Sequence, residues 1–178
     1  MKLVVSDIFG RTPELESLVG ALKGPVTIFD PYDSMFMGFT SQNQAYEHFN
    51  QHVGLNNYAQ QLLAFIKSFS VPLTIIGFSV GASAIWKISD NSGLKHVSHA
   101  QCFYGSQIRY DVDIIPAFAI ELIFPVFEHH FEINMLIEAL VTKPNVKIQQ
   151  VNYLHGFMNA LSANFDKEAY AQYIEKIA

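Results

Sequence analysis

The sequence predicts an α/β fold in which helices cover both faces of a mostly parallel central sheet, a three-layer sandwich. Short apolar runs alternate with helical segments along the 178 residues, and this alternation is typical of parallel strands joined by helical crossovers. Half of the residues are hydrophobic and 15% are charged, which provides for one large core. No repeat, low-complexity tract or linker divides the chain, so residues 1–178 are expected to form one domain.

The amino-terminal part is expected to hold two strands and three helices. Thr12, Pro13 and Glu14 have the order of an N-cap, a first-turn proline and a first-turn acid, so they begin the first helix. Apolar residues at helical spacing, from Leu62 to Phe69, indicate a strongly amphipathic helix. The expected elements are a strand at 3–6, a helix at 13–22, a strand at 26–29, and helices at 43–52 and 58–69.

The remaining chain continues the alternation. Its strands are short apolar runs, and its last helix begins after the polar segment around Asp166. The expected elements are a strand at 73–77, a helix at 82–88, strands at 97–104 and 117–124, a helix at 133–140, a strand at 146–151 and a helix at 167–177.

A G-x-S-x-G pattern, Gly77-Phe78-Ser79-Val80-Gly81, joins one predicted strand to the helix that follows it. In a strand–turn–helix context this pattern strains the serine backbone and exposes the hydroxyl at the start of the helix. The small glycines let strand and helix approach closely, and the helix end offers unpaired N–H groups to a developing oxyanion. Ser79 is therefore a candidate nucleophile, with a plain tight turn as the alternative.

Two further candidates follow later strands. Glu128 comes after the 117–124 strand and His155 after the 146–151 strand, so the chain order is serine, acid, histidine, as in α/β-hydrolases. An imidazole takes the serine proton, and a carboxylate fixes the tautomer of the imidazole. Glu132 competes with Glu128 for the acid role, and His155 could instead be a structural histidine.

Five segments of the chain, in order, resemble motifs of the dienelactone hydrolase family. They are D-I-F-G-R-T-P at 7–13, G-F-S-V-G at 77–81, F-Y-G at 103–105, F-P-V-F-E at 124–128 and H-G-F-M-N at 155–159. The resemblance implies an α/β-hydrolase fold with Ser79 as nucleophile, His155 as base and Glu128 as acid. It also implies an oxyanion hole from the backbone N–H groups of Ile8 and Val80.

The chain departs from this family in several respects. Serine replaces the usual cysteine nucleophile, and Asp7 stands where the family has a glutamate that controls the thiol, so the role of Asp7 is open. The usual first hairpin looks absent, so the fold is expected to be shortened at the N-terminus. Its loss would expose a sheet edge, which predicts a possible homodimer.

The candidate substrate contacts favour a small neutral substrate. The loop after Asp30 carries Tyr32, Met35 and Phe36 where substrate-binding arginines are expected from the resemblance, and the Met35–Met37 cluster is either core or acyl pocket. A small ester, lactone or thioester is the expected substrate. The candidate substrate-binding residues are Asp7, Phe9, Tyr32, Phe36, Phe78 and Arg109, the last being the one nearby cation.

Composition argues against several other classes of function. The formal net charge is −5 and no Lys/Arg stripe is present, so no nucleic-acid partner is expected. The single cysteine, Cys102, excludes an intrachain disulfide and fits a reducing compartment. The first residues do not resemble a signal peptide and no apolar run is long enough for a membrane span, so a cytoplasmic location is expected.

Three open points remain at the level of sequence. The adjacent His129 and His130 invite a metal site, but no helical His–carboxylate pair accompanies them, so no metal and no cofactor is expected. Glu121 lies in an apolar strand, as an edge residue or a histidine partner. The alternative to an enzyme is a hydrolase-like binding module that has lost activity, in which Ser79 and His155 would lie more than about 4 Å apart.

Overall fold

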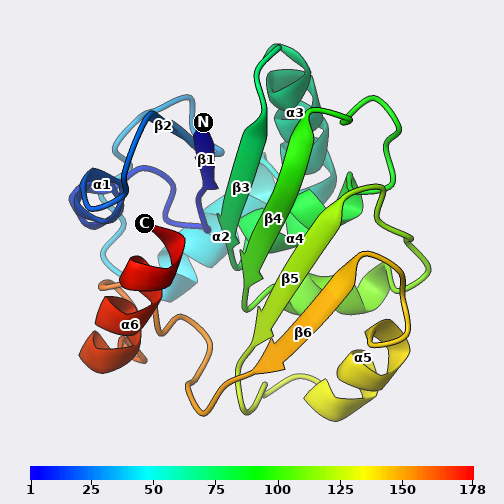
Figure 1. Cartoon of the computed structure of the whole chain (residues 1–178). Helices are drawn as coiled ribbons and strands as arrows, with labels where there is room; N and C mark the ends of the chain where they lie inside the picture. Colours follow the sequence, from blue (N-terminus) through cyan, green and yellow to red (C-terminus); the bar gives the residue numbers. More distant parts are fainter.

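Six parallel strands form the centre of the protein (Figure 1). The computed structural model describes residues 1–178, and the strands lie in the order β2-β1-β3-β4-β5-β6. Every neighbouring pair is parallel, so the predicted mostly parallel sheet is confirmed and is parallel throughout. The strands are β1 (Lys2–Val5), β2 (Val26–Phe29), β3 (Leu73–Phe78), β4 (Val97–Phe103), β5 (Ala119–Phe124) and β6 (Val146–Gln150).

Helices cover both faces of this sheet and complete the predicted three layers. The buried residues of α1 and α6 join one apolar cluster, and those of α2 to α5 join a second cluster on the opposite face. Figure 1 shows α1 and α6 side by side on one face of the sheet. The helices are α1 (Pro13–Gly20), α2 (Gln42–His52), α3 (Leu55–Lys67), α4 (Val80–Lys87), α5 (Ile133–Leu140) and α6 (Lys167–Ile177).

The alternation of side chains along β3 explains how the two clusters form. Leu73 and Ile75 pack into the cluster under α2 to α5, whereas Ile76 and Phe78 pack into the cluster under α1 and α6. Gly77 faces α4, where an added Cβ would overlap the side chain of Ile85. The glycine therefore lets α4 pack close against the sheet, and residues Val80 to Trp86 of that helix are all buried.

The structure corrects some of the expected boundaries. Helix α4 begins directly after Ser79 rather than at residue 82, α3 begins at Leu55 rather than at Tyr58, and β5 begins at Ala119 rather than at residue 117. A short 3₁₀ helix, η1 (Ser106–Tyr110), was not expected because five residues are too few for a periodic pattern.

The first strand of the chain lies inside the sheet, and β2 forms the edge on its side. β1 lies between β2 and β3, and the two edges are β2 and β6. A homodimer thus stays a prediction. Glu121 lies on the interior strand β5, where it pairs with Lys147 of β6 at 2.9 Å and accepts a hydrogen bond from Gln101 of β4 at 3.1 Å. It is neither an edge residue nor a histidine partner.

Parallel pairing brings the carboxyl ends of all six strands to one edge of the sheet. The residues that directly follow the six strands therefore lie at that edge; they are Ser6, Asp30, Ser79, Tyr104, Pro125 and Val151. The longest helix has 13 residues, and no helix combines the length and the hydropathy that a membrane crossing requires.

Candidate active site

Ser79 occupies a strained turn between β3 and α4. Its φ of 52° and ψ of −113° are unfavourable for a residue with a side chain, and such strain costs about 1–3 kcal/mol. The Ser79 N–H donates to the carbonyl of Phe103 on β4 at 2.9 Å, which anchors the turn to the sheet. A Cβ at Gly81 would overlap the backbone carbonyls of Val5 and Ser6, so the first turn of α4 passes against the end of β1. Glycine is required there.

Three side chains from three strand ends form a continuous hydrogen-bonded chain. The Ser79 Oγ lies 3.0 Å from His155 Nε2, and His155 Nδ1 lies 2.7 Å from Glu128 Oε1. An ionised carboxylate only accepts hydrogen bonds, so Nδ1 carries the proton and Nε2 is free to accept from the serine hydroxyl. The 3.0 Å distance is shorter than the separation of about 4 Å on which the hypothesis of an inactive module depends.

The structure places Glu128, and not Glu132, against the histidine. Glu128 is 8% exposed, whereas Glu132 is exposed and occupies the N-cap of α5. A buried carboxylate is costly unless it is hydrogen-bonded, and the imidazole of His155 supplies that partner. Of the two acids that the sequence left open, Glu128 is therefore the one that completes the hydrogen-bonded chain with Ser79 and His155.

The two candidate oxyanion donors have free N–H groups. Val80 is the first residue of α4, so its N–H has no partner within the helix. The Ile8 N–H makes no hydrogen bond, and the Ile8 carbonyl accepts one from the hydroxyl of Tyr32 at 2.7 Å. Tyr32 is 4% exposed, so its hydroxyl fixes the Ile8 peptide instead of reaching into the open site.

Asp7 ties the loop after β1 to the loop that carries His155. Its carboxylate accepts from the Phe9 N–H at 2.9 Å and from Asn159 Nδ2 at 2.6 Å. Burial raises the pKa of Asp7, and the two hydrogen bonds and the nearby His155 offset part of that rise. Sequence analysis assigned no role to Asn159, although the residue closes the 155–159 motif, because a contact across 152 residues has no local signal.

The other candidate substrate contacts fall into different surroundings. Phe9 and Phe78 are buried and line a cavity, whereas Phe36 is 56% exposed. Arg109 donates to the Ser106 carbonyl and to the Tyr110 hydroxyl, both at 2.6 Å, and its guanidinium stacks on aromatic rings. The guanidinium of Arg109 is thus engaged by its own surroundings.

The core interpretation of the Met35–Met37 cluster is wrong, because Met35 is 59% exposed and Met37 is only partly buried. Cys102 is buried in β4, and burial raises the pKa of its thiol. A buried, protonated thiol is not a nucleophile, which leaves Ser79 as the candidate.

Tyr104 is a neighbour of the histidine that sequence reasoning missed. It follows β4 with a positive φ of 43°, and its ring centroid lies 4.9 Å from that of His155. Its hydroxyl is buried without a hydrogen-bond partner. The F-Y-G motif at 103–105 was the only sequence signal at this position.

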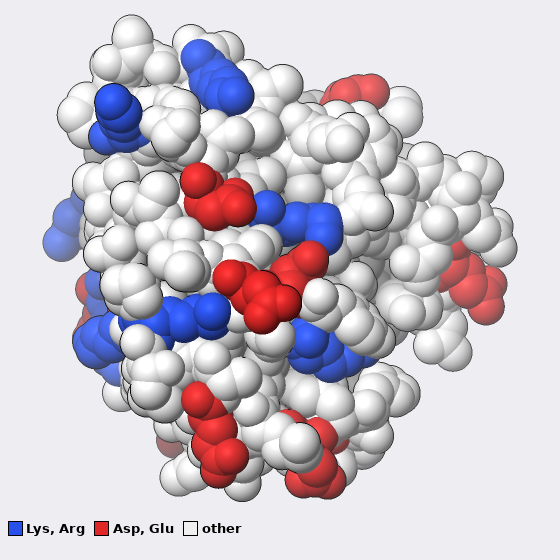
Figure 2. Space-filling model, turned by 90° about the vertical axis from the view of Figure 1, so that its right-hand side faces the viewer, with Lys and Arg blue, Asp and Glu red and all other residues white.

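Charged side chains of both signs are interspersed on the face shown in Figure 2.

No three His, Cys, Asp or Glu side chains are grouped so as to hold a metal ion.

Comparison with known proteins identifies the fold. No protein-family model matches the chain. The uncharacterized protein YczH of Bacillus subtilis is 35% identical over 129 residues, a match that covers 71% of this chain and 62% of that relative. The chain therefore spans less than two thirds of the relative that it matches.

Solved structures resemble the chain over nearly its whole length. A dienelactone hydrolase candidate from Klebsiella pneumoniae matches with a TM-score of 0.76 at 13% identity. The match covers 98% of this chain and 83% of the Klebsiella chain. Dienelactone hydrolase from Anabaena variabilis has a TM-score of 0.67 at 12% identity, with 99% and 83% covered. Alpha/beta hydrolase domain-containing protein 10 from mouse has a TM-score of 0.62 at 9% identity, with 99% and 87% covered. The chain has the α/β-hydrolase fold.

Proposed function

We propose that this protein of the α/β-hydrolase fold is a serine hydrolase of the dienelactone hydrolase-like type. It cleaves a small ester, lactone or thioester through an acyl-enzyme on Ser79. The observation that carries the proposal is the hydrogen-bonded chain from Ser79 Oγ through His155 to Glu128, with distances of 3.0 and 2.7 Å. Its three members come from three separate strand ends.

In the first step, His155 Nε2 accepts the hydroxyl proton while Ser79 Oγ forms a bond to the substrate carbonyl carbon. The carbonyl π electrons move to the oxygen, and the Glu128 carboxylate stabilises the imidazolium. The oxyanion accepts hydrogen bonds from the Ile8 and Val80 N–H groups, each worth about 3 kcal/mol in comparable sites. When the intermediate collapses, the bond to the leaving group breaks and His155 returns the proton to that group.

The second step clears the acyl group with water. His155 Nε2 accepts a proton from the water as the water oxygen bonds to the acyl carbon. The ester bond to Ser79 Oγ then breaks, and the proton passes from His155 to the serine. The product is a carboxylic acid, and both the serine and the neutral histidine are restored.

The rim of the site favours a neutral, apolar substrate. Large apolar side chains are exposed on loops that follow strands β2, β5 and β6, at the edge of the sheet that carries Ser79. Arg109, the cation that the sequence put forward for a substrate carboxylate, is already engaged by a carbonyl and an aromatic ring. The exposed apolar residues on these loops are Met35, Phe36, Val126, Phe127 and Leu154.

The test uses the purified chain, p-nitrophenyl acetate and a fluorophosphonate probe. We expect turnover of the ester and labelling of one serine, both of which are lost in Ser79→Ala. The exposed Ser92 provides the matched control, and Ser92→Ala should behave as the native chain does. Absence of both turnover and labelling in the native chain, or equal labelling of Ser79→Ala, would contradict the proposal.

A further inference from the structure

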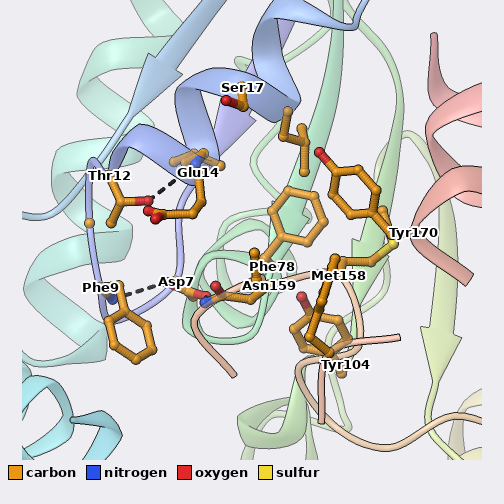
Figure 3. Close-up of a pocket in the computed structure, with 15 residues that line it drawn as sticks. Asp7, Phe9, Thr12, Glu14, Ser17, Phe78, Tyr104, Met158, Asn159 and Tyr170 are labelled. Carbon is orange, nitrogen blue, oxygen red and sulfur yellow. Dashed lines mark hydrogen bonds between the residues drawn. The ribbon is translucent and has the colours of Figure 1, made fainter. Parts of the chain in front are cut away.

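A cavity of about 240 Å³ lies between α1, α6 and the carboxyl end of β3 (Figure 3). It is separate from the catalytic chain, because neither Ser79 nor His155 is among the 15 residues that line it. Tyr104 stands between the two sites, since it lines the cavity and its ring lies 4.9 Å from that of His155.

The walls of the cavity are mostly apolar and carry no positive charge. Nine of the 15 lining residues are hydrophobic, and no Lys, Arg or His is among them. Two carboxylates, those of Asp7 and Glu14, line it as well, so an anionic ligand would meet repulsion without a compensating cation. The apolar walls include Leu15, Leu18, Phe78, Met158, Phe165 and Tyr170.

The Tyr104 hydroxyl is an unsatisfied polar group in this apolar space. Tyr104 is 1% exposed, and no group makes a hydrogen bond with its hydroxyl. Burial raises the Tyr104 pKa, and the nearby Met158 N–H offsets part of that rise. Because an N–H group only donates, it leaves the hydroxyl proton of Tyr104 without an acceptor. In Figure 3 the Tyr104 side chain rises into the cavity from below, toward Phe78. Buried hydroxyls without partners are rare in native proteins, so this one points to a ligand that supplies an acceptor.

The size of the cavity limits the ligand. An apolar protein cavity of about 150 Å³ binds benzene, so 240 Å³ accommodates one aromatic ring with a substituent or two. We propose that this cavity binds a small uncharged phenol or aromatic alcohol. Its ring packs against Phe78 and Leu18, and its oxygen accepts a hydrogen bond from Tyr104. This second site does not depend on the hydrolase activity.

Ligand-observed fluorine NMR tests the proposal with three probes of similar shape. We expect para-fluorophenol to bind saturably and about tenfold more tightly than para-fluorotoluene, which lacks the acceptor oxygen. The anion para-fluorobenzoate should not bind. In Tyr104→Phe, the phenol and the toluene should bind equally. Equal binding of the phenol and the toluene to the native chain, or binding of none of the probes, would overturn the proposal.

Two further measurements locate the bound phenol. Ala160 is exposed and lines the cavity, so Ala160→Trp should abolish binding, whereas Ala163→Trp in the same loop should not. A thermal melt of both variants checks that they fold. Binding should persist in Ser79→Ala and after fluorophosphonate capping of the native chain. Loss of binding on capping would place the phenol in the catalytic site and overturn a second site, whereas a chain without esterase activity leaves this inference intact.

Discussion

Replacement of Glu128 by glutamine tests the proposed role of the carboxylate with almost no change in shape. Glu128 is 8% exposed, and its Oε1 lies 2.7 Å from His155 Nδ1. If the new amide oxygen accepts from Nδ1–H, the tautomer survives but the negative charge that stabilises the imidazolium is lost. If the amide N–H₂ donates instead, the proton moves to Nε2 and Ser79 loses its acceptor.

Both arrangements lower the rate of acylation. Loss of the correct tautomer alone costs about 10⁴-fold in a serine protease, so we expect kcat to fall between about 10²-fold and 10⁴-fold. This corresponds to about 3–5.5 kcal/mol of transition-state stabilisation. The free energy of unfolding should change by only about 1 kcal/mol, because one hydrogen bond is altered and the volume is kept.

The assay is p-nitrophenyl acetate hydrolysis, with urea unfolding as the check on folding. Glu132→Gln is the matched control, since Glu132 is exposed and does not contact His155; its activity should equal that of the native chain. The reasoning is refuted if Glu128→Gln keeps more than about a tenth of the native kcat, or if Glu132→Gln loses as much activity.

Three other substitutions test the scaffold. Tyr32→Phe removes the 2.7 Å hydrogen bond to the Ile8 carbonyl, so kcat should fall about tenfold with KM nearly unchanged. An unchanged kcat would show that this bond does not hold the Ile8 N–H in place for the oxyanion. Gly81→Ala should lower the free energy of unfolding by about 1–3 kcal/mol, because the new Cβ would overlap the end of β1. Gly20→Ala is the control: its Cβ meets open space, so it should raise the free energy of unfolding by up to about 1 kcal/mol. Equal effects of the two substitutions in urea melts would contradict the close approach of α4 to β1. Burial raises the pKa of Glu121, but hydrogen bonds from Lys147 and Gln101 outweigh it and hold the pKa below its usual value. Its stabilisation is therefore present at neutral pH and lost as the pH falls through that lowered pKa. Glu121→Gln should thus lower the free energy of unfolding by under about 1 kcal/mol at neutral pH and should leave it unchanged in acid. A loss of stability that grows in acid would contradict the direction of the pKa shift.

The sequence predicted the elements that a local pattern encodes. Strand β2 and helices α5 and α6 begin and end where hydrophobic periodicity and capping residues placed them. The position of Ser79 in a turn between strand and helix was predictable because a G-x-S-x-G pattern between an apolar run and a helical segment is typical of such a turn. Parallel topology then follows from the alternation of strands and helices, and it brings the ends of distant strands together.

Contacts that depend on the register of strands or on loop paths could not be predicted. The pairing of Glu121 with Lys147 depends on which residues of β5 and β6 face each other, and no residue in either strand encodes that register alone. The bond from Tyr32 to the Ile8 carbonyl and the bond from Asn159 to Asp7 join separate loops. The exposed Met35 shows the converse limit, because an apolar residue in a loop can lie in the core or at a rim with the same local sequence.

Intact-mass analysis of the chain during turnover of a p-nitrophenyl ester, followed by peptide mapping, tests the central proposal most directly. The proposed mechanism predicts one acyl group per chain on the peptide that contains Ser79, formed at the rate of the p-nitrophenol burst, and none in Ser79→Ala. Turnover without a covalent adduct, or an acyl group mapped to any other residue, would contradict it.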